Sequence, residues 1–298
     1  MRILVAGWFS FETMGAGAGD LLARDVLCDW LDRAGHRYDV ALASPFSGGV
    51  DWRTVPPESV DTLIFVCGPV GNGPPLTDLL AHFAGRRVVA VDVSLLQSRV
   101  EWNPFDILFE RDSESTSRPD LSFASGKPLV PLVGVLLTDV QPEYGNRDRR
   151  EQANAAIQRL IESESMAVVR IDTRLDSNTT GLRTASEIES VIARMDVVLT
   201  TRLHGLVLSL KNGVPPIAID SVAGRGKVSR QAAALGWPLI FEADTVTDPQ
   251  LREAFACCGS PTGRQQVEIC RQHALRALEQ LRIEFIDSLG ALERRGAR

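Results

Sequence analysis

The sequence predicts an α/β protein made of two parallel-sheet domains, with a long helix at the end of the chain. Short runs rich in β-branched residues alternate with stretches whose apolar residues recur at helical spacing, which is typical of βαβ units. This alternation occurs in two series, separated by a Gly-Pro turn at 125–128. The 298 residues also exceed the size at which a single hydrophobic core usually stops growing.

The first series predicts five strands with helices between them. The clearest helix is expected over 20–34, where Leu22, Val26 and Trp30 form an apolar stripe. The strands are expected over 2–6, 38–43, 62–66, 88–93 and 107–110.

The second series begins with the apolar run 129–137, which predicts the first strand of a new sheet. A helix follows in which Ala153, Ala156 and Leu160 share one face, and another is expected over 184–195. Because the turn at 125–128 separates the two series, the predicted domains are 1–126 and 127–298. The further strands are expected over 167–171, 196–200, 216–219 and 239–241.

The last element is a long helix that starts near Gly263. Its apolar residues are spaced at nearly a heptad repeat, which is typical of core packing against the rest of the protein. The same spacing would also form the seam of a homo-oligomer. The stripe comprises Val267, Cys270, Ala274, Leu278, Leu281, Phe285 and Leu289.

Composition excludes several classes of protein. A hydrophobic content of 44% with 23% charged residues is that of a globular protein. The net charge of −6 argues against a nucleic-acid partner. The apolar run 3–6 is too short for a signal sequence or a membrane span, so we expect a cytoplasmic location. Five cysteines without a Cys-x-x-Cys pair predict reduced thiols, and no spacing predicts a metal site.

The segment 196–220 carries the strongest indication of chemistry. It reads as strand, turn, helix, turn and strand, and Thr200 or Thr201 is expected to cap the helix. Arg202 and His204 then lie in the first turn. Because a helix N-terminus carries partial positive charge and unpaired N–H groups, this arrangement favours an anion site. The alternative is that Arg202 pairs with a local acid such as Asp196 or Asp220 and that His204 has no special role.

The order of residues in this half resembles the signature of the polysaccharide pyruvyl transferase family. The matching pieces are Thr201-Arg-Leu-His-Gly205, then Gly213-Val-Pro215, then Lys227 ahead of Leu235-Gly236. The resemblance implies two Rossmann-like domains, similar to the GT-B glycosyltransferases. It also implies transfer of the enolpyruvyl group of phosphoenolpyruvate to a sugar, with no cofactor besides this co-substrate. Arg202 and His204 would bind the donor, with His204 as an acid or base.

Two further pieces resemble the family in the first half of the chain. Arg111 begins an Arg-Asp-x-x-Ser element, and residues 15–20 resemble a Gly-rich first loop. The resemblance implies that Arg111 and Lys227 also contact the donor, and that the first domain holds the acceptor near Gly15, Gly17 and Asp20. The alternatives are a solvated Lys227, an Arg111 paired with Asp112 or Glu114, and an Asp20 that only caps a helix.

The sequence also departs from the family pattern. Asp20 is followed by Leu21, and the arginine that the family carries after the first strand of the second domain is missing from 136–139. Two rival functions therefore remain: a GT-B-like nucleotide-sugar glycosyltransferase, and a family member without catalysis that binds glycans.

Overall fold

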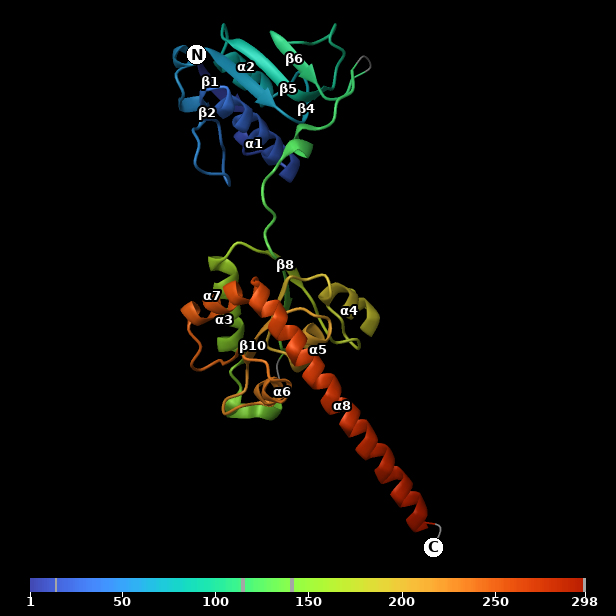
Figure 1. Ribbon diagram of the computed structural model, residues 1–298. Helices are drawn as coiled ribbons and strands as arrows, with labels where there is room; N and C mark the ends of the chain where they lie inside the picture. Colours follow the sequence, from blue (N-terminus) through green and yellow to red (C-terminus); the bar gives the residue numbers. More distant parts are fainter. Residues whose placement is uncertain (14, 114–115, 140–141, 297–298) are drawn as a thin grey trace. The chain divides into compact units, whose positions relative to one another are not determined.

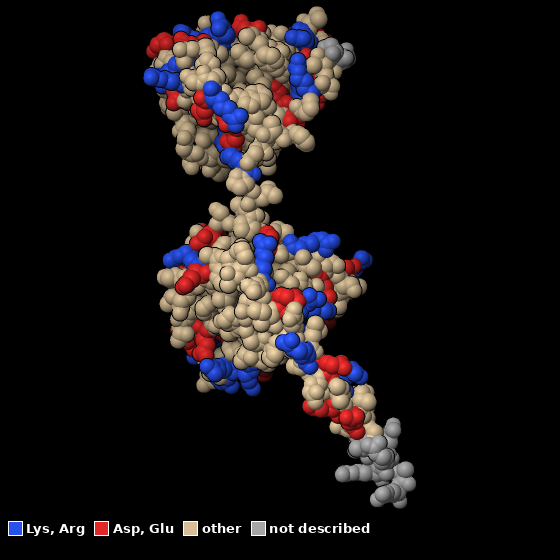
Figure 2. Space-filling model, viewed as in Figure 1, with Lys and Arg blue, Asp and Glu red and all other residues tan. Residues whose placement is uncertain are grey.

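The computed structural model divides the chain into two compact units, Met1–Pro128 and Leu129–Arg298 (Figure 1). The division follows Pro128, the last residue of the turn at 125–128 and two residues after the boundary drawn from the sequence. The structure describes the chain except for residues 14, 114–115, 140–141 and 297–298. In Figure 2, Lys and Arg side chains are interspersed with Asp and Glu on the visible face of each unit.

The first unit is built around a parallel sheet whose strands follow the order β2-β1-β3-β5-β4, with β6 paired to β5. Residues of β3 are all buried, because helices and short turns cover both faces of the sheet. The strands are β1 (Arg2–Ala6), β2 (Arg37–Val40), β3 (Thr62–Val66), β4 (Pro69–Val70), β5 (Arg87–Leu95) and β6 (Ile107–Glu110).

Helices cover the two faces of this sheet with separate apolar cores. On one face, α1 (Ala18–Arg33) packs Val26 and Leu27 against Ile3 and Ile64 of the strands. On the other face, α2 (Leu76–His82) packs against alternate residues of the same strands. The alternation follows from the strand period of two, which sends successive side chains to opposite faces. The 3₁₀ turns among the described residues of both units are η1 (Trp8–Ser10), η2 (Trp52–Thr54), η3 (Pro57–Ser59), η4 (Leu121–Ala124) and η5 (Pro142–Arg147).

The second unit repeats this plan with a five-stranded parallel sheet of order β11-β10-β9-β7-β8. One face is covered by α3 and α7, and the other by α4, α5, α6 and the start of α8. The strands are β7 (Leu132–Leu136), β8 (Ala167–Arg170), β9 (Val197–Thr200), β10 (Pro216–Asp220) and β11 (Ile240–Glu242). The helices are α3 (Arg150–Ser163), α4 (Ala185–Ile192), α5 (Leu203–Lys211), α6 (Lys227–Leu235), α7 (Asp248–Cys258) and α8 (Pro261–Gly296).

Both sheets have a point at which the strand order reverses. Leaving aside the two-residue β4, each unit runs in the doubly wound order 2-1-3-4-5, counted along its own strands. In the first unit the reversal lies between β1 and β3, and in the second between β7 and β9. Open α/β sheets bind ligands outside the carboxyl ends of the strands at such a point. The predicted fold class, two parallel-sheet α/β domains with a long C-terminal helix, is confirmed.

The long helix α8 packs against its own unit only at its beginning. Val267 and Cys270 are each 1% exposed and join the core with α5 and α6. The later members of the predicted core stripe are exposed, including Leu278 at 59% and Phe285 at 57%. The expectation that the whole stripe packs into a core is therefore wrong beyond Ala274, because α8 extends away from its own unit (Figure 1). No helix among the described residues is long and apolar enough to cross a membrane.

Two predicted strands are shorter than expected. The strand predicted over 129–137 begins only at Leu132, because Pro128 and Pro131 lack the N–H that a strand donates, and Leu129 is 96% exposed. The strand predicted over 38–43 ends at Val40.

Candidate functional site

The N-terminus of α5 is held in place by its neighbour strand β9. The buried Thr200 hydroxyl donates to the Leu136 carbonyl at 3.0 Å and accepts from the Arg202 N–H at 2.9 Å. Arg202 is itself the N-cap residue, and α5 starts at Leu203. The prediction that Arg202 lies inside the first turn, capped by a threonine side chain, is therefore wrong by one residue, because Arg202 precedes the helix. His204 does lie in the first turn.

Arg202 reaches from this cap across the sheet edge and is largely enclosed, with its side chain 15% exposed. Its guanidinium donates to the Leu137 carbonyl and to the Thr173 hydroxyl, and it forms an ion pair with Asp139 at 2.5 Å. The nearly buried Asp172 lies 3.5 Å away. Arg202 thus pairs with acids, as the alternative interpretation expected, but with Asp139 and Asp172 rather than Asp196 or Asp220.

Asp172 is a fixed negative charge behind Arg202. Burial raises its pKa, but N–H groups of Arg174 and Thr179 and the Arg202 guanidinium outweigh burial and hold the pKa below its usual value. Its carboxylate accepts from the Arg174 N–H at 3.0 Å and from the Thr179 N–H at 3.2 Å. The carboxylate therefore stays ionised at neutral pH and fixes the Arg202 guanidinium in the site.

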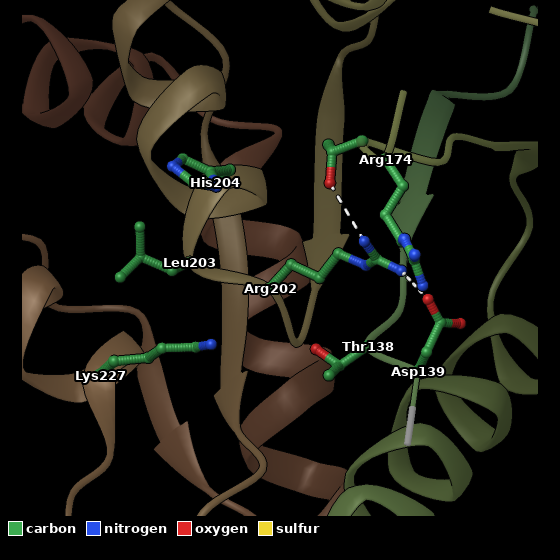
Figure 3. Close-up of a pocket in the computed structure, with 8 residues that line it drawn as sticks. Thr138, Asp139, Arg174, Arg202, Leu203, His204 and Lys227 are labelled. Carbon is green, nitrogen blue, oxygen red and sulfur yellow. Dashed lines mark hydrogen bonds and ion pairs between the residues drawn. The ribbon is translucent and has the colours of Figure 1, made fainter. Parts of the chain in front are cut away.

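A cavity of about 310 Å³ lies beside Arg202 at the strand-order reversal between β7 and β9. It is formed by the loops after β7 and β8, by the start of α5 and by the start of α6 (Figure 3). Its lining is mainly polar and contains three cationic side chains besides a histidine. The lining residues are Thr138, Asp139, Thr173, Arg174, Arg202, Leu203, His204 and Lys227.

His204 and Lys227 enter this cavity from two different helices. His204 is exposed, and its ring has no hydrogen-bond partner among the described residues. Lys227 is the first residue of α6, and its ammonium lies 5.8 Å from the centre of the Tyr144 ring. Figure 3 shows the ammonium pointing toward the space beside Arg202 and Thr138. The structure thus brings three of the four predicted donor ligands to one cavity.

The loop before Lys227 is held by hydrogen bonds to Asp220. The buried Asp220 accepts from the Val222 N–H at 3.1 Å and from the Ser229 N–H at 2.8 Å. A Cβ on Gly226 would lie 2.6 Å from the Asp220 carboxylate, so this position requires glycine. Asp220 therefore fixes the N-terminus of α6 next to that of α5.

Arg111, the fourth predicted donor ligand, lies in the first unit and does not line this cavity. Its guanidinium forms an ion pair with Asp120 at 2.7 Å and donates to the Ser94 hydroxyl at 3.0 Å. Asp112 is more distant, at 3.8 Å, and Glu114 lies outside the described residues. Arg111 is therefore paired within its own unit, chiefly with an acid that the sequence analysis did not consider.

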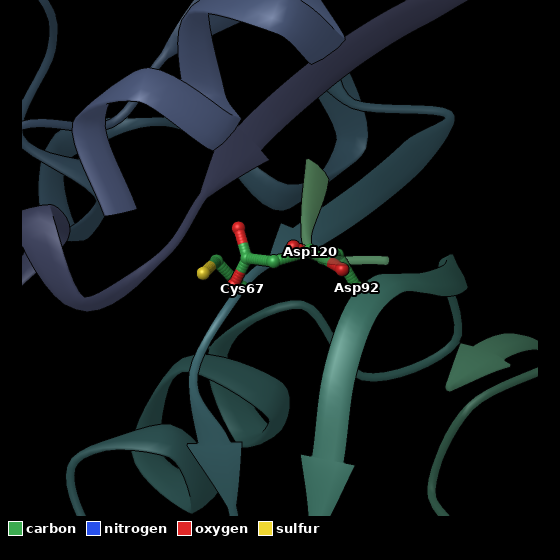
Figure 4. Close-up of side chains that lie close together, drawn as sticks. All are labelled: Cys67, Asp92 and Asp120. Atoms are coloured by element: carbon green, nitrogen blue, oxygen red, sulfur yellow. The ribbon is translucent and has the colours of Figure 1, made fainter. Parts of the chain in front are cut away.

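Arg111 borders a cluster of Cys67, Asp92 and Asp120, whose ligand atoms lie within 4.8 Å of one another (Figure 4). Sequence spacing gave no sign of this group, because its members come from three separate segments. Burial raises the pKa of the Cys67 thiol to about 12 and also raises the pKa of Asp92. The Arg111 guanidinium already pairs with the Asp120 carboxylate and stabilises its charged form. All five cysteines are free thiols, as predicted.

The predicted acceptor loop borders a second cavity, of about 420 Å³, in the first unit. Gly15 and Asp20 line it together with Trp8, Asn72 and Gln97, whereas Gly17 does not. The Asp20 carboxylate accepts from the Gly17 N–H at 2.8 Å, so it caps α1 as the alternative interpretation expected.

Sequence reasoning missed the residues of the β8–α4 loop. Thr173 and Arg174 follow β8, and the cavity includes them only because β8 is the neighbour of β7 in the sheet. The signal available in the sequence was weak, namely the polar run after a predicted strand at 172–176.

Comparison with known proteins finds a family model that matches part of the chain. Residues 119–221 match the family model of polysaccharide pyruvyl transferase. The matched segment contains Arg174, Arg202 and His204 but ends before Lys227. No curated protein sequence matches the chain significantly.

Several solved structures resemble the chain over nearly its whole length, with low identity. The glycotransferase of kitacinnamycin is 12% identical, covers 93% of this chain and 95% of its own, and has a TM-score of 0.33. The UDP-GlcNAc 2-epimerase from Methanocaldococcus jannaschii is 11% identical, with 92% and 100% covered and a TM-score of 0.32. Spinosyn forosaminyltransferase is 14% identical, with 94% and 99% covered and a TM-score of 0.32. Residues 119–221 of the chain are thus similar to the polysaccharide pyruvyl transferase family, and the structural neighbours add no argument about function.

Proposed function

We propose that this protein transfers the pyruvyl group of phosphoenolpyruvate to a sugar hydroxyl of a glycan or glycan precursor, forming a pyruvate ketal. The family match supports a glycan-modifying transferase. The observation that carries the choice of donor is the cavity of about 310 Å³ lined by Arg174, Arg202, His204 and Lys227.

The charge of this cavity suits a small, multiply charged donor. Arg202 and Lys227 supply positive charge, and the first turns of α5 and α6 add N–H groups that have no intrahelical acceptor. Phosphoenolpyruvate carries a carboxylate and a phosphate only a few bonds apart, so both can meet cationic groups in one small cavity.

The proposed reaction adds two hydroxyl oxygens of the sugar to C2 of the donor. Protonation of C3 makes C2 electrophilic, and one hydroxyl attacks it. The second hydroxyl then displaces phosphate from C2. Of the two hydroxyl protons, one is balanced by the proton gained at C3 and the other leaves with phosphate. The His204 imidazole lines the cavity and is the group to which we assign the proton transfer.

The acceptor is proposed to bind in the first unit, at the cavity of about 420 Å³ lined by Trp8, Asp20, Asn72 and Gln97. This cavity lies where β1 and β3 end, which is the strand-order reversal of the first sheet. Amide and carboxylate groups beside an indole ring suit a sugar, which has hydroxyls along its edges and an apolar face.

The nucleotide-sugar alternative is less well supported by the lining of the donor cavity. Among the described residues that line it there is no Phe, Tyr or Trp, and its one ring is the His204 imidazole, to which we assign proton transfer. The alternative of a protein without catalysis rested on the arginine that is missing from 136–139. Arg174 brings a guanidinium to the same cavity from another strand.

Thermal stabilisation by ligands tests the choice of donor. Phosphoenolpyruvate at 100 times its dissociation constant should stabilise the native protein by about 2.7 kcal/mol, because it binds the folded state alone. Release of phosphate should then be measured with a panel of glycosides. Strong stabilisation by uridine or guanosine diphosphate sugars, with none by phosphoenolpyruvate, would reject the proposal in favour of a glycosyltransferase.

A further inference from the structure

We infer that Arg174 binds the carboxylate of the donor together with Arg202, and so replaces the arginine that this chain lacks after β7. This inference rests on the proposed function, because it assigns one anionic group of the donor to a residue pair. Arg174 comes from the loop between β8 and α4, and it lines the same cavity as Arg202, His204 and Lys227.

The loop that carries Arg174 is held by a network of its own hydrogen bonds. The buried Asp172 carboxylate accepts from the Arg174 N–H at 3.0 Å, and the Asn178 amide donates to the Arg174 carbonyl at 2.7 Å. Asn178 also accepts from the Leu182 N–H at 3.0 Å. The backbone of Arg174 is thus fixed on both sides, and its guanidinium donates to both carboxylate oxygens of Asp176, at 3.0 and 2.5 Å. The pair is exposed, with side-chain exposures of 46% for Arg174 and 69% for Asp176, so a bound carboxylate can exchange with Asp176 at little cost.

Asp139 shows where a carboxylate lies against the Arg202 guanidinium on the side that Arg174 faces. Its side chain is 63% exposed and lies 2.5 Å from the Arg202 guanidinium. Its charge also raises the pKa of Arg174, after the larger effect of Asp176. Figure 3 shows Arg174 and Arg202 reaching toward Asp139 from different elements. A donor carboxylate that takes the position of Asp139 would meet both guanidinium groups.

The two ends of the cavity then divide the donor between them. Guanidinium groups match the planar geometry of a carboxylate, so the arginine pair suits the carboxylate end. The N-termini of α5 and α6, with Lys227, suit the phosphate, because helix N–H groups and an ammonium surround an anion without requiring planarity. This division gives Arg174 a role that depends on the carboxylate and not on the phosphate.

Competition calorimetry on the full chain tests this division with two probes, pyruvate and inorganic phosphate, each displacing phosphoenolpyruvate. Arg174→Ala should lower the affinity for phosphoenolpyruvate and for pyruvate by about 10- to 100-fold, as expected for lost charge-assisted hydrogen bonds. Affinity for inorganic phosphate should change less than about twofold. Arg174→Lys should give an intermediate loss, because the ammonium keeps the charge but not the planar fork.

Arg183→Ala is the matched control, since Arg183 lies in the same loop, is 84% exposed, pairs with Glu187 and is not among the cavity-lining residues. It should bind all three ligands as the wild type does. The assignment is wrong if Arg174→Ala binds pyruvate with the affinity of the wild type, or if its affinity for inorganic phosphate falls instead. Failure of the wild type to bind phosphoenolpyruvate would instead overturn the proposed function, so the two failures are distinguishable.

Discussion

Gly205 decides how α5 starts, because no other residue fits next to Thr200. A Cβ at this position would lie 2.1 Å from the Thr200 hydroxyl oxygen. This hydroxyl is buried, donates a hydrogen bond to the Leu136 carbonyl and accepts one from the Arg202 N–H. The glycine of the Arg202-Leu-His-Gly205 segment is thus required by packing, whereas Arg202 and His204 supply the chemical groups. A larger residue would have to displace the cap that presents Arg202.

Substitution of Gly205 by alanine should therefore destabilise the second unit. Alanine favours helix by up to about 1 kcal/mol over glycine, but overpacking of a buried contact costs about 1 to 3 kcal/mol. We expect a net loss in the free energy of unfolding, measured by urea denaturation. Gly259→Ala is the control, because its Cβ would meet only ordinary contacts, the nearest at 3.6 Å. Equal stability of the two variants would contradict this account of the cap.

Asp139 is expected to compete with the donor for Arg202. The donor must displace its carboxylate, and an exposed ion pair is worth at most about 1 kcal/mol. Asp139→Asn should therefore lower the dissociation constant of phosphoenolpyruvate by about two- to fivefold in calorimetry. Weaker donor binding in this variant would mean that Asp139 positions Arg202 rather than occupying the donor's place.

Asp92 gives a pH-dependent prediction in the first unit. Burial is the largest effect that raises its pKa above the ordinary 3.8, and the charge of Asp120 adds to it, although the Leu121 N–H opposes the shift. The folded state then binds more protons than the unfolded state, so this group's contribution to stability falls as pH rises through the interval between the two pKa values.

Asp92→Asn removes this ionisation and should melt at a higher temperature than the wild type at pH 7. Asparagine also tolerates the positive φ of 61° at this position. The advantage should shrink as the pH is lowered toward 3.8 in a series of thermal melts. A variant that is less stable than the wild type at pH 7 would show that the carboxylate is needed in its charged form.

At the scale of elements, the sequence predicted best the pieces whose pattern is local. The continuous apolar run of β3 and the Thr-Arg-x-His-Gly motif at the start of α5 could be identified because the chain itself supplies their pattern. The donor role that we propose for the β8–α4 loop could not be predicted, because it depends on β8 lying beside β7. The cluster of Cys67, Asp92 and Asp120 could not be predicted either, because its members come from three segments that only the fold brings together.

The helix α8 shows the limit of periodicity as evidence. Its apolar stripe is regular from Val267 to Leu289, but only the first part meets the core of the unit. Periodicity identifies which face of a helix is apolar, and it does not identify what covers that face. The homo-oligomer that this stripe allows remains a prediction.

Truncation of α8 separates its two parts. At a concentration low enough for both chains to be monomeric, a chain that ends after Arg276 should keep its melting temperature within about 2 °C of the full chain, since the side chains of Leu278, Leu281 and Phe285 are more than half exposed. Val267→Ala should lower the free energy of unfolding by roughly 1 to 3 kcal/mol, because this side chain is 1% exposed.

Light scattering tests the homo-oligomer that the stripe allows. The full chain should give a multiple of 32.5 kDa, and the chain that ends after Arg276 should give a monomer. A monomeric full chain would rule out pairing through the stripe.

At the scale of the whole molecule, the same fold appears twice and each copy offers a cavity at its strand-order reversal. The second unit presents cations and helix N-termini, whereas the first presents amides, a carboxylate and an indole. The difference in chemistry between the two edges is the basis for assigning an anionic donor to one and a sugar to the other. The central claim is that Arg202 holds the donor while His204 transfers a proton.

Calorimetry of phosphoenolpyruvate with the full chain, paired with phosphate release from the same samples, tests this claim most directly. Arg202→Ala should lose measurable donor binding, because a charge-assisted pair with the donor is removed. His204→Gln should retain most donor affinity while turnover falls about 10²- to 10⁴-fold, because glutamine cannot exchange a proton near neutral pH. Full donor affinity in Arg202→Ala, or wild-type turnover in His204→Gln, would contradict the role assigned to that residue.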